Sequence, residues 1–155
     1  MRLWRISAHA NFDGEGARRF GGRWNRPGTA IVYTAATLAL ATLEFRVHFD
    51  RRRIRARVFA HYADVPDDAG VERVNDDRLP ASWRAHPTVD ELREIGTSWA
   101  LAGKSVLLAV PSAILRVDPA LVPAERNYLL NPAHAEFGRI RVRSVQVELD
   151  PRVWR

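Results

Sequence analysis

Seventeen consecutive residues, from Pro27 to Leu43, carry no charge, and Glu44 is the charge that ends this run. Within it, AIVYT at 30–34 has the length and apolar content of a buried strand. The stretch from Thr37 to Phe49 has the pattern of a helix, with Thr37 as its N-cap. A strand and a helix of this kind need a hydrophobic core to cover them. This segment therefore belongs to the centre of the fold.

Other apolar patterns predict further strands. Leu3, Trp4 and Ile6 indicate an opening strand, residues 54–60 alternate as a half-exposed strand does, and 105–110 is an apolar run that Pro111 closes. Near the end, the alternation changes phase between two groups of apolar residues, Ile140 and Val142 and then Val145, Val147 and Leu149. A β-bulge at 143–144 would reconcile the two phases.

Loops and one more helix fill the remaining chain. Residues 9–28 include Gly14, Gly16, Gly21 and Gly22 and predict a loop with unusual backbone dihedrals. The acidic segment 64–87 predicts a long loop with a short helix around Trp83. Thr88 and Glu91 fit a capping box for a helix that Gly103 ends. Strands in mixed order with helices between them predict one compact α/β (α+β) domain over residues 1–155, a mixed β-sheet with flanking helices.

Composition limits the setting of the protein. The chain has no cysteine, so its stability comes from packing and a reducing cytoplasm suits it. Its first residues lack the apolar run of a signal peptide, and no stretch reaches the roughly 18 apolar residues of a membrane span. We therefore expect a soluble, cytoplasmic protein with no membrane partner.

The formal net charge of +6 raises the hypothesis of a basic nucleic-acid-binding module. The dense arginine run at 51–57 is, however, typical of a solvated surface or of an attachment for an acidic partner. Aromatic residues are not interleaved with the run as a single-strand stacking platform requires. Nucleic-acid binding is therefore the less favoured hypothesis. Charge reversal at Arg52 and Arg53 would test whether the run binds an acidic partner.

Two isolated features suggest ligand binding. Arg23 follows Gly21 and Gly22, a combination that suits a phosphate because backbone amides can approach it while the guanidinium grips two oxygens, although the same turn also occurs as a surface hairpin. Tyr33 lies in the strand at 30–34, where an aromatic residue is more often part of the core than a ligand contact.

Two further residues carry reactive groups. On the predicted helix, Glu44 lies one turn from apolar residues. Its carboxylate is therefore expected to be paired, protonated or functional. The alternatives are that the helix turns Glu44 to its rim, or that Glu44 pairs with an arginine. Ser112 follows an apolar strand, and it is either a presented hydroxyl or a helix cap, since no nucleophile elbow surrounds it. The five histidines show no metal-ligand spacing, so we expect no metal site and ordinary surface or satisfied histidines.

These pieces stand in a fixed order along the chain: WR at 4–5, GGRWN at 21–25, VYTA at 32–35, LATLE at 40–44, VPSA at 110–113, ERNYLLNPAH at 125–134 and LDPR at 149–152. In this order the chain resembles the RES domain family over nearly its whole length. The family is named for an Arg, a Glu and a Ser, which match Arg23, Glu44 and Ser112. The resemblance implies a fold like that of ADP-ribosyltransferases.

It also implies the toxin of a type II toxin–antitoxin system that degrades NAD by cleaving the nicotinamide–ribose bond. By this resemblance Arg23 holds a phosphate of NAD, Tyr33 packs against the nicotinamide or its ribose, and Glu44 accepts a hydrogen bond from that ribose. Ser112 orients Glu44 or a ribose hydroxyl, and Asn127 adds a supporting polar contact. NAD is then a substrate, and no cofactor is expected.

The resemblance leaves the acceptor and the assembly open. Hydrolysis, phosphorolysis and transfer to a protein side chain all fit, so a protein ADP-ribosyltransferase toxin is the alternative. The implied partner is an Xre-like antitoxin with a helix-turn-helix, through which nucleic acid would be contacted. A homodimer within a larger toxin–antitoxin complex is compatible with this expectation.

Overall fold

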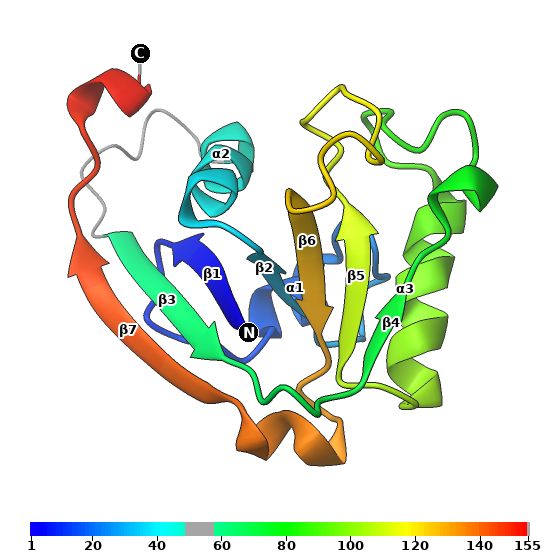
Figure 1. The fold of residues 1–155 in the computed structure, drawn as a ribbon, viewed down its shortest axis with the longest axis horizontal. Helices are drawn as coiled ribbons and strands as arrows, with labels where there is room; N and C mark the ends of the chain where they lie inside the picture. The colour runs from blue at the N-terminus through cyan, green and yellow to red at the C-terminus, as the bar shows by residue number, and fades with distance from the viewer. Residues whose placement is uncertain (49–57, 155) are drawn as a thin grey trace.

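The computed structural model describes residues 1–48 and 58–154. These residues form one mixed sheet of seven strands in the order β4-β5-β6-β2-β1-β3-β7 (Figure 1). The strands are β1 Arg2–Ser7, β2 Val32–Ala35, β3 Val58–Asp64, β4 Val71–Arg73, β5 Leu107–Pro111, β6 Arg126–Leu130 and β7 Arg141–Val147. Strands β4 and β5 run parallel, and the other neighbours run antiparallel. The expected α/β (α+β) class with a mixed sheet is confirmed.

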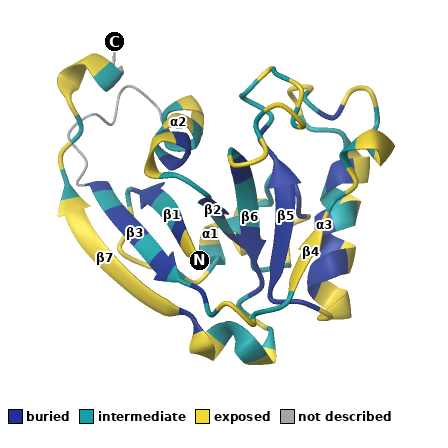
Figure 2. Ribbon diagram, in the orientation of Figure 1, coloured by how far each residue is buried: buried dark blue, intermediate teal, exposed yellow. Residues whose placement is uncertain are grey.

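Two helices cover different parts of this sheet. Apolar residues of α3 (Asp90–Ala102) share a buried cluster with residues of β5 and β6, and those of α2 (Leu38–His48) share another with residues of β1 and β3. The remaining helical elements are short: α1 Glu15–Phe20, η2 Asp76–Arg78, η3 Ala135–Arg139 and η4 Pro151–Trp154. Every residue of β5 is buried, whereas β7 at the sheet edge is exposed over nearly its whole length (Figure 2).

Several expected features are confirmed. The strands expected near residues 3–6, 30–34 and 105–110 are present as β1, β2 and β5. The Thr37 hydroxyl accepts a hydrogen bond from the Leu40 amide at 3.1 Å, as an N-cap does. Gly103 ends α3 in the left-handed conformation at φ 58°.

Other expectations were wrong. The 9–28 segment contains α1, and the 64–87 segment contains β4 and η2. Val89 precedes α3 and makes no side-chain capping bond, so the Thr88–Glu91 capping box is absent. Strand β7 pairs with β3 in continuous register from 141 to 147 without a bulge. Because that edge strand is exposed on both faces, its apolar residues need not keep one phase.

Two parts of the chain need separate mention. Strand β6 begins with the polar residues Arg126 and Asn127, and its apolar pattern is too short to have predicted it. The arginine run at 51–57 and the first half of the strand expected at 54–60 lie outside the described residues. Among the helices of the described ranges, none is long and apolar enough to cross a membrane.

Gly96 of α3 lies where the Trp24 backbone crosses the helix. A Cβ atom at Gly96 would lie 1.9 Å from the Trp24 carbonyl oxygen, and the Trp24 backbone is held in place by the loop around it. We therefore expect Gly96→Ala to lower the free energy of unfolding by about 1–3 kcal/mol, as overpacking of a core does.

Gly16 of α1 is the matched control, because a Cβ there meets nothing within 4 Å among the described residues. Chemical denaturation of both variants measures the difference. Equal stability of Gly96→Ala and the parent chain would contradict the close approach of α3 to Trp24.

Candidate active site

The carboxylate of Glu44 on α2 accepts two hydrogen bonds on the same oxygen. The Ser112 hydroxyl donates to Oε1 at 2.8 Å, and the Asn127 amide Nδ2 donates to Oε1 at 2.6 Å. No residue in the described ranges donates to Oε2, and none forms an ion pair with Glu44. Of the alternatives open from the sequence, Glu44 is thus paired, and its partners are neutral donors rather than an arginine.

The pairing of the strands brings these three residues together. Ser112 directly follows Pro111, the last residue of β5, and Pro111 lies opposite Arg126 at the start of β6. Asn127 is the next residue of β6, and it lies opposite Ala35 at the end of β2. Helix α2 begins three residues after Ala35, so Glu44 reaches the same end of the sheet.

This environment fixes the position of the carboxylate. Two neutral donors occupy Oε1, and neither brings a charge to the group. Ser112 is 4% exposed, which gives its hydroxyl a defined position. The free oxygen Oε2 can therefore accept a hydrogen bond from a ligand hydroxyl at a defined place.

Arg23 is partly buried and leaves part of its guanidinium available. Its Nη1 donates to the carbonyl oxygens of Trp83 at 2.8 Å and Ala85 at 3.1 Å. Within the described ranges, its Nε and Nη2 have no hydrogen-bond partner and the group forms no ion pair. Burial lowers the pKa of Arg23, while the nearby charge of Glu44 acts in the opposite direction. The group remains a cation, because an arginine does not lose its proton in proteins.

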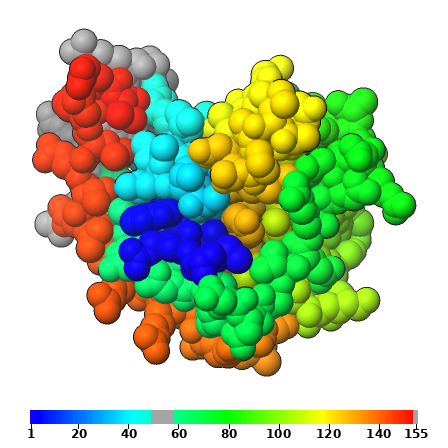
Figure 3. All heavy atoms as spheres, in the orientation of Figure 1, coloured from blue at the N-terminus to red at the C-terminus, as the bar shows by residue number. Residues whose placement is uncertain are grey.

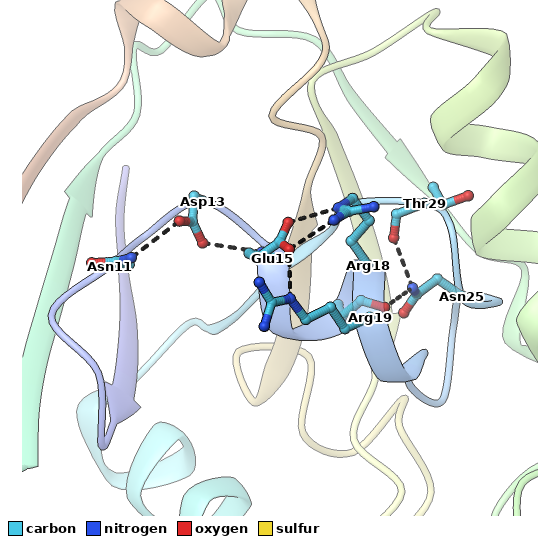
Figure 4. Close-up of polar contacts among 8 residues, drawn as sticks. Asn11, Asp13, Glu15, Arg18, Arg19, Asn25 and Thr29 are labelled. Atoms are coloured by element: carbon cyan, nitrogen blue, oxygen red, sulfur yellow. Dashed lines mark hydrogen bonds and ion pairs between the residues drawn. The ribbon is translucent and has the colours of Figure 1, made fainter.

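The loop that carries Arg23 is built around Asn25. The Asn25 side chain is fully buried, and its Nδ2 donates to the carbonyl oxygens of Ala17, Arg26 and Thr29 at 2.9, 3.0 and 2.9 Å. Figure 4 shows the contact between Asn25 and Thr29. On the neighbouring helix α1, Glu15 pairs with Arg18 and Arg19 in the same view. These contacts make the loop a rigid support for Arg23.

Tyr33 of β2 completes this frame. Its hydroxyl donates to Asn25 Oδ1 at 2.7 Å and accepts from the Trp24 amide at 3.0 Å. A Cβ at Gly22 would lie 2.5 Å from that hydroxyl, which explains the glycine. Burial raises the pKa of Tyr33 well above its ordinary value, so the hydroxyl stays protonated and keeps its donor role.

Comparison with known proteins shows the family of the chain. Residues 2–152 match the family model described as RES domain. The chain belongs to the RES domain family. The resemblance noted in the sequence is thereby confirmed.

Relatives of this RES domain match it along most of their length. A protein of Sphingobium sp. (strain YBL2) named Prs ADP-ribosylating toxin is 38% identical, over 99% of this chain and 96% of its own. Proteins named Toxin Res, from Yersinia enterocolitica and Pseudomonas putida, are 32% and 35% identical, over 99% and 92% of this chain and 99% and 93% of theirs.

A solved structure shares the fold. A chain in the crystal structure of the M. tuberculosis MbcT-MbcA toxin-antitoxin complex superposes with a TM-score of 0.75 at 20% identity, covering 99% of this RES domain and 86% of that chain.

Sequence reasoning gave no role to two residues beside this RES site. Asn25 looks like an ordinary turn residue, yet it holds the loop of Arg23. Arg5 of β1 donates through Nη1 to the Tyr33 carbonyl at 3.1 Å, and burial lowers its pKa. Its signal was the WR pair, an arginine between the apolar residues Trp4 and Ile6.

The hydrogen bonds of Glu44 and Arg23 within the described ranges involve no histidine. No group of three or more His, Asp or Glu in the described ranges is arranged to hold a metal ion. His61 is fully buried, with Nδ1 2.7 Å from the Ser144 hydroxyl and Nε2 3.0 Å from the His9 carbonyl. It is a satisfied core histidine, and burial lowers its pKa.

Removing the Tyr33 hydroxyl tests the frame of the RES site. In Tyr33→Phe the Trp24 amide and Asn25 Oδ1 lose their partner, so we expect the free energy of unfolding to fall by about 1–2 kcal/mol. Tyr128→Phe is the matched control, because the Tyr128 hydroxyl has no hydrogen-bond partner in the described part of the chain. Thermal unfolding compares the two, and an equal loss in both variants would argue against the frame.

Proposed function

We propose that this RES domain is the toxin of a toxin–antitoxin system and that it cleaves the bond between nicotinamide and ribose in NAD. The observation that carries the proposal is the Glu44 carboxylate, held on Oε1 by Ser112 and Asn127 with Oε2 left open among the described residues. The arrangement suits a reaction in which positive charge develops on a bound sugar.

In the proposed reaction the bond from ribose C1′ to the nicotinamide nitrogen breaks. Its electron pair goes to the nitrogen, which leaves as neutral nicotinamide, and C1′ takes on oxocarbenium character. Glu44 accepts a hydrogen bond from a hydroxyl of that ribose through Oε2. Its negative charge stabilises the cationic sugar more strongly than the ground state, which is the requirement for catalysis.

The other residues bind and orient NAD. The free Nε and Nη2 of Arg23 form one edge of the guanidinium, the geometry that grips a phosphate through two hydrogen bonds. The Tyr33 hydroxyl supports the loop that carries Arg23, and the Tyr33 ring packs against the nicotinamide or its ribose. Ser112 and Asn127 position Glu44 and take no covalent part.

An acceptor oxygen completes the reaction by bonding to C1′ and losing its proton. Water gives ADP-ribose, and inorganic phosphate gives a phosphorylated ADP-ribose. Transfer to a protein side chain is the second candidate, and the name of the Sphingobium relative, an ADP-ribosylating toxin, favours it. The proposed roles of Glu44 and Arg23 are the same with each of the three acceptors.

The proposed partner is a cognate antitoxin. Relatives named Toxin Res and a structural neighbour from a toxin–antitoxin complex support this assignment. An Xre-like antitoxin, a homodimer of the toxin and a cytoplasmic setting remain predictions from the sequence.

Nicotinamide release measures the proposed function. The purified chain is incubated with NAD, and we expect Glu44→Gln to lower the rate of release by at least about 100-fold, because the charge at the sugar is lost. Glu91→Gln, on the exposed first turn of α3, is the matched control and should retain the parent rate. Equal rates in the parent and Glu44→Gln would contradict the role of Glu44.

The same assay identifies the acceptor. The chain is incubated with NAD in one buffer with inorganic phosphate and in one without. Release in both buffers with ADP-ribose as product indicates that water is the acceptor, and release that requires phosphate indicates phosphorolysis. If labelled NAD transfers its ADP-ribose to a protein in a cell extract but no free product forms, the second candidate holds. Absence of all three reactions in the parent chain would contradict NAD cleavage.

A further inference from the structure

A partly buried ion pair lies next to Asn127, one of the two residues that donate to Glu44. Both terminal nitrogens of Arg126 donate to the two oxygens of Asp76, each at 2.8 Å. Arg126 is 2% exposed, and its Nε is buried without a partner in the described ranges. The hydrogen bonds from Arg126 lower the pKa of Asp76, so the pair stays ionised. Burying such a pair is costly and often adds little stability, so its position invites a specific role.

Arg126 lies beside both segments that supply donors to Glu44. It is the residue before Asn127, and it lies opposite Pro111, the residue before Ser112. Its carbonyl oxygen accepts from the Ala36 amide at 2.9 Å, and neighbouring Glu125 accepts from the Thr37 hydroxyl at 3.2 Å. In the space-filling view the start of α2 lies against the segment that leads into β6 (Figure 3).

Asp76 is itself held in a fixed turn. The Asn75 side chain accepts from the Asp77 amide at 3.0 Å and caps η2. The Val74 amide donates to the Ala109 carbonyl of β5 at 3.0 Å, which ties this turn to the sheet. The carboxylate of Asp76 therefore reaches Arg126 from a rigid base.

We propose that the Arg126–Asp76 ion pair is a positioning device for the active site. The pair fixes the first residues of β6, and thereby sets the Asn127 amide and the Ser112 hydroxyl on Oε1 of Glu44. Arg126 and Asp76 are positioning residues that contact no substrate. The catalytic consequence rests on the proposed NAD cleavage, whereas the effect on Asn127 does not.

Asp76→Asn tests the device, because it removes the charge and one acceptor while keeping the size of the side chain. Asp68→Asn is the matched control. Asp68 also forms a two-oxygen pair with an arginine, Arg139, at 2.6 and 2.7 Å, but that pair is exposed and distant from Glu44 in the fold.

The first readout needs no activity. The side-chain amide signal of Asn127, identified in a ¹H–¹⁵N spectrum by its loss in Asn127→Ala, reports the bond to Glu44. We expect Asp76→Asn to move this signal in the direction in which Glu44→Gln moves it, and Asp68→Asn to leave it in place. An unmoved signal in folded Asp76→Asn overturns the proposal, whether or not the chain cleaves NAD.

The second readout is kinetic. In Asp76→Asn we expect kcat for nicotinamide release to fall by about 10- to 100-fold with little change in KM for NAD, as misplacement of a catalytic group does. In the Asn127→Ala background the same substitution should lower kcat clearly less than in the parent chain, because only its effect through Ser112 remains. Additive losses in the double variant would instead indicate general destabilisation and overturn the proposal.

If Asp76→Asn does not fold, Asp76→Glu replaces it in both readouts. This variant keeps the charge and lengthens the side chain by one methylene. We expect a smaller shift of the Asn127 signal in the same direction, and an unmoved signal overturns the proposal.

Discussion

The site is organised around Oε1 of Glu44 on α2, which accepts a hydrogen bond from a residue of β6 and another from the residue that follows β5. A half-buried carboxylate is stabilised by hydrogen-bond donors. Ser112 and Asn127 supply them at 2.8 and 2.6 Å. For both to reach one oxygen, the end of β5, the start of β6 and Glu44 of α2 must lie at the same edge of the sheet, and the pairing of Pro111 with Arg126 aligns the two strands there.

A second rigid unit faces the first. The Asn25 side chain closes the loop that carries Arg23, and the Tyr33 hydroxyl joins this loop to β2. The loop also rests on α3, where Gly96 admits the Trp24 carbonyl and the Thr97 hydroxyl accepts from the Arg26 amide at 3.0 Å. A cation and a carboxylate are thus fixed independently, which suits a substrate with phosphates at one end and a reacting sugar at the other.

Local sequence patterns predicted what depends on near neighbours. The uncharged run placed β2 and α2, and Thr37 caps the helix as its position suggested. Only the order of motifs connected Ser112 and Asn127 with Glu44 in the sequence. Their approach to Glu44 depends on a β5–β6 pairing between segments that are distant in the chain. No sequence pattern indicated that position 96 requires a glycine, because the constraint comes from the Trp24 backbone, which is distant in the sequence. The bulge expected in β7 failed because an exposed edge strand has no core that selects one phase.

The central claim is that Oε2 of Glu44 receives the nicotinamide ribose. A crystal structure of Glu44→Gln grown with NAD tests it most directly, because the substitution keeps the shape of the site while slowing cleavage. We expect a hydroxyl of the nicotinamide ribose within about 2.6–3.2 Å of the outer atom of the side chain at position 44, with a phosphate on the free edge of Arg23. NAD bound with its nicotinamide ribose away from position 44 would contradict it.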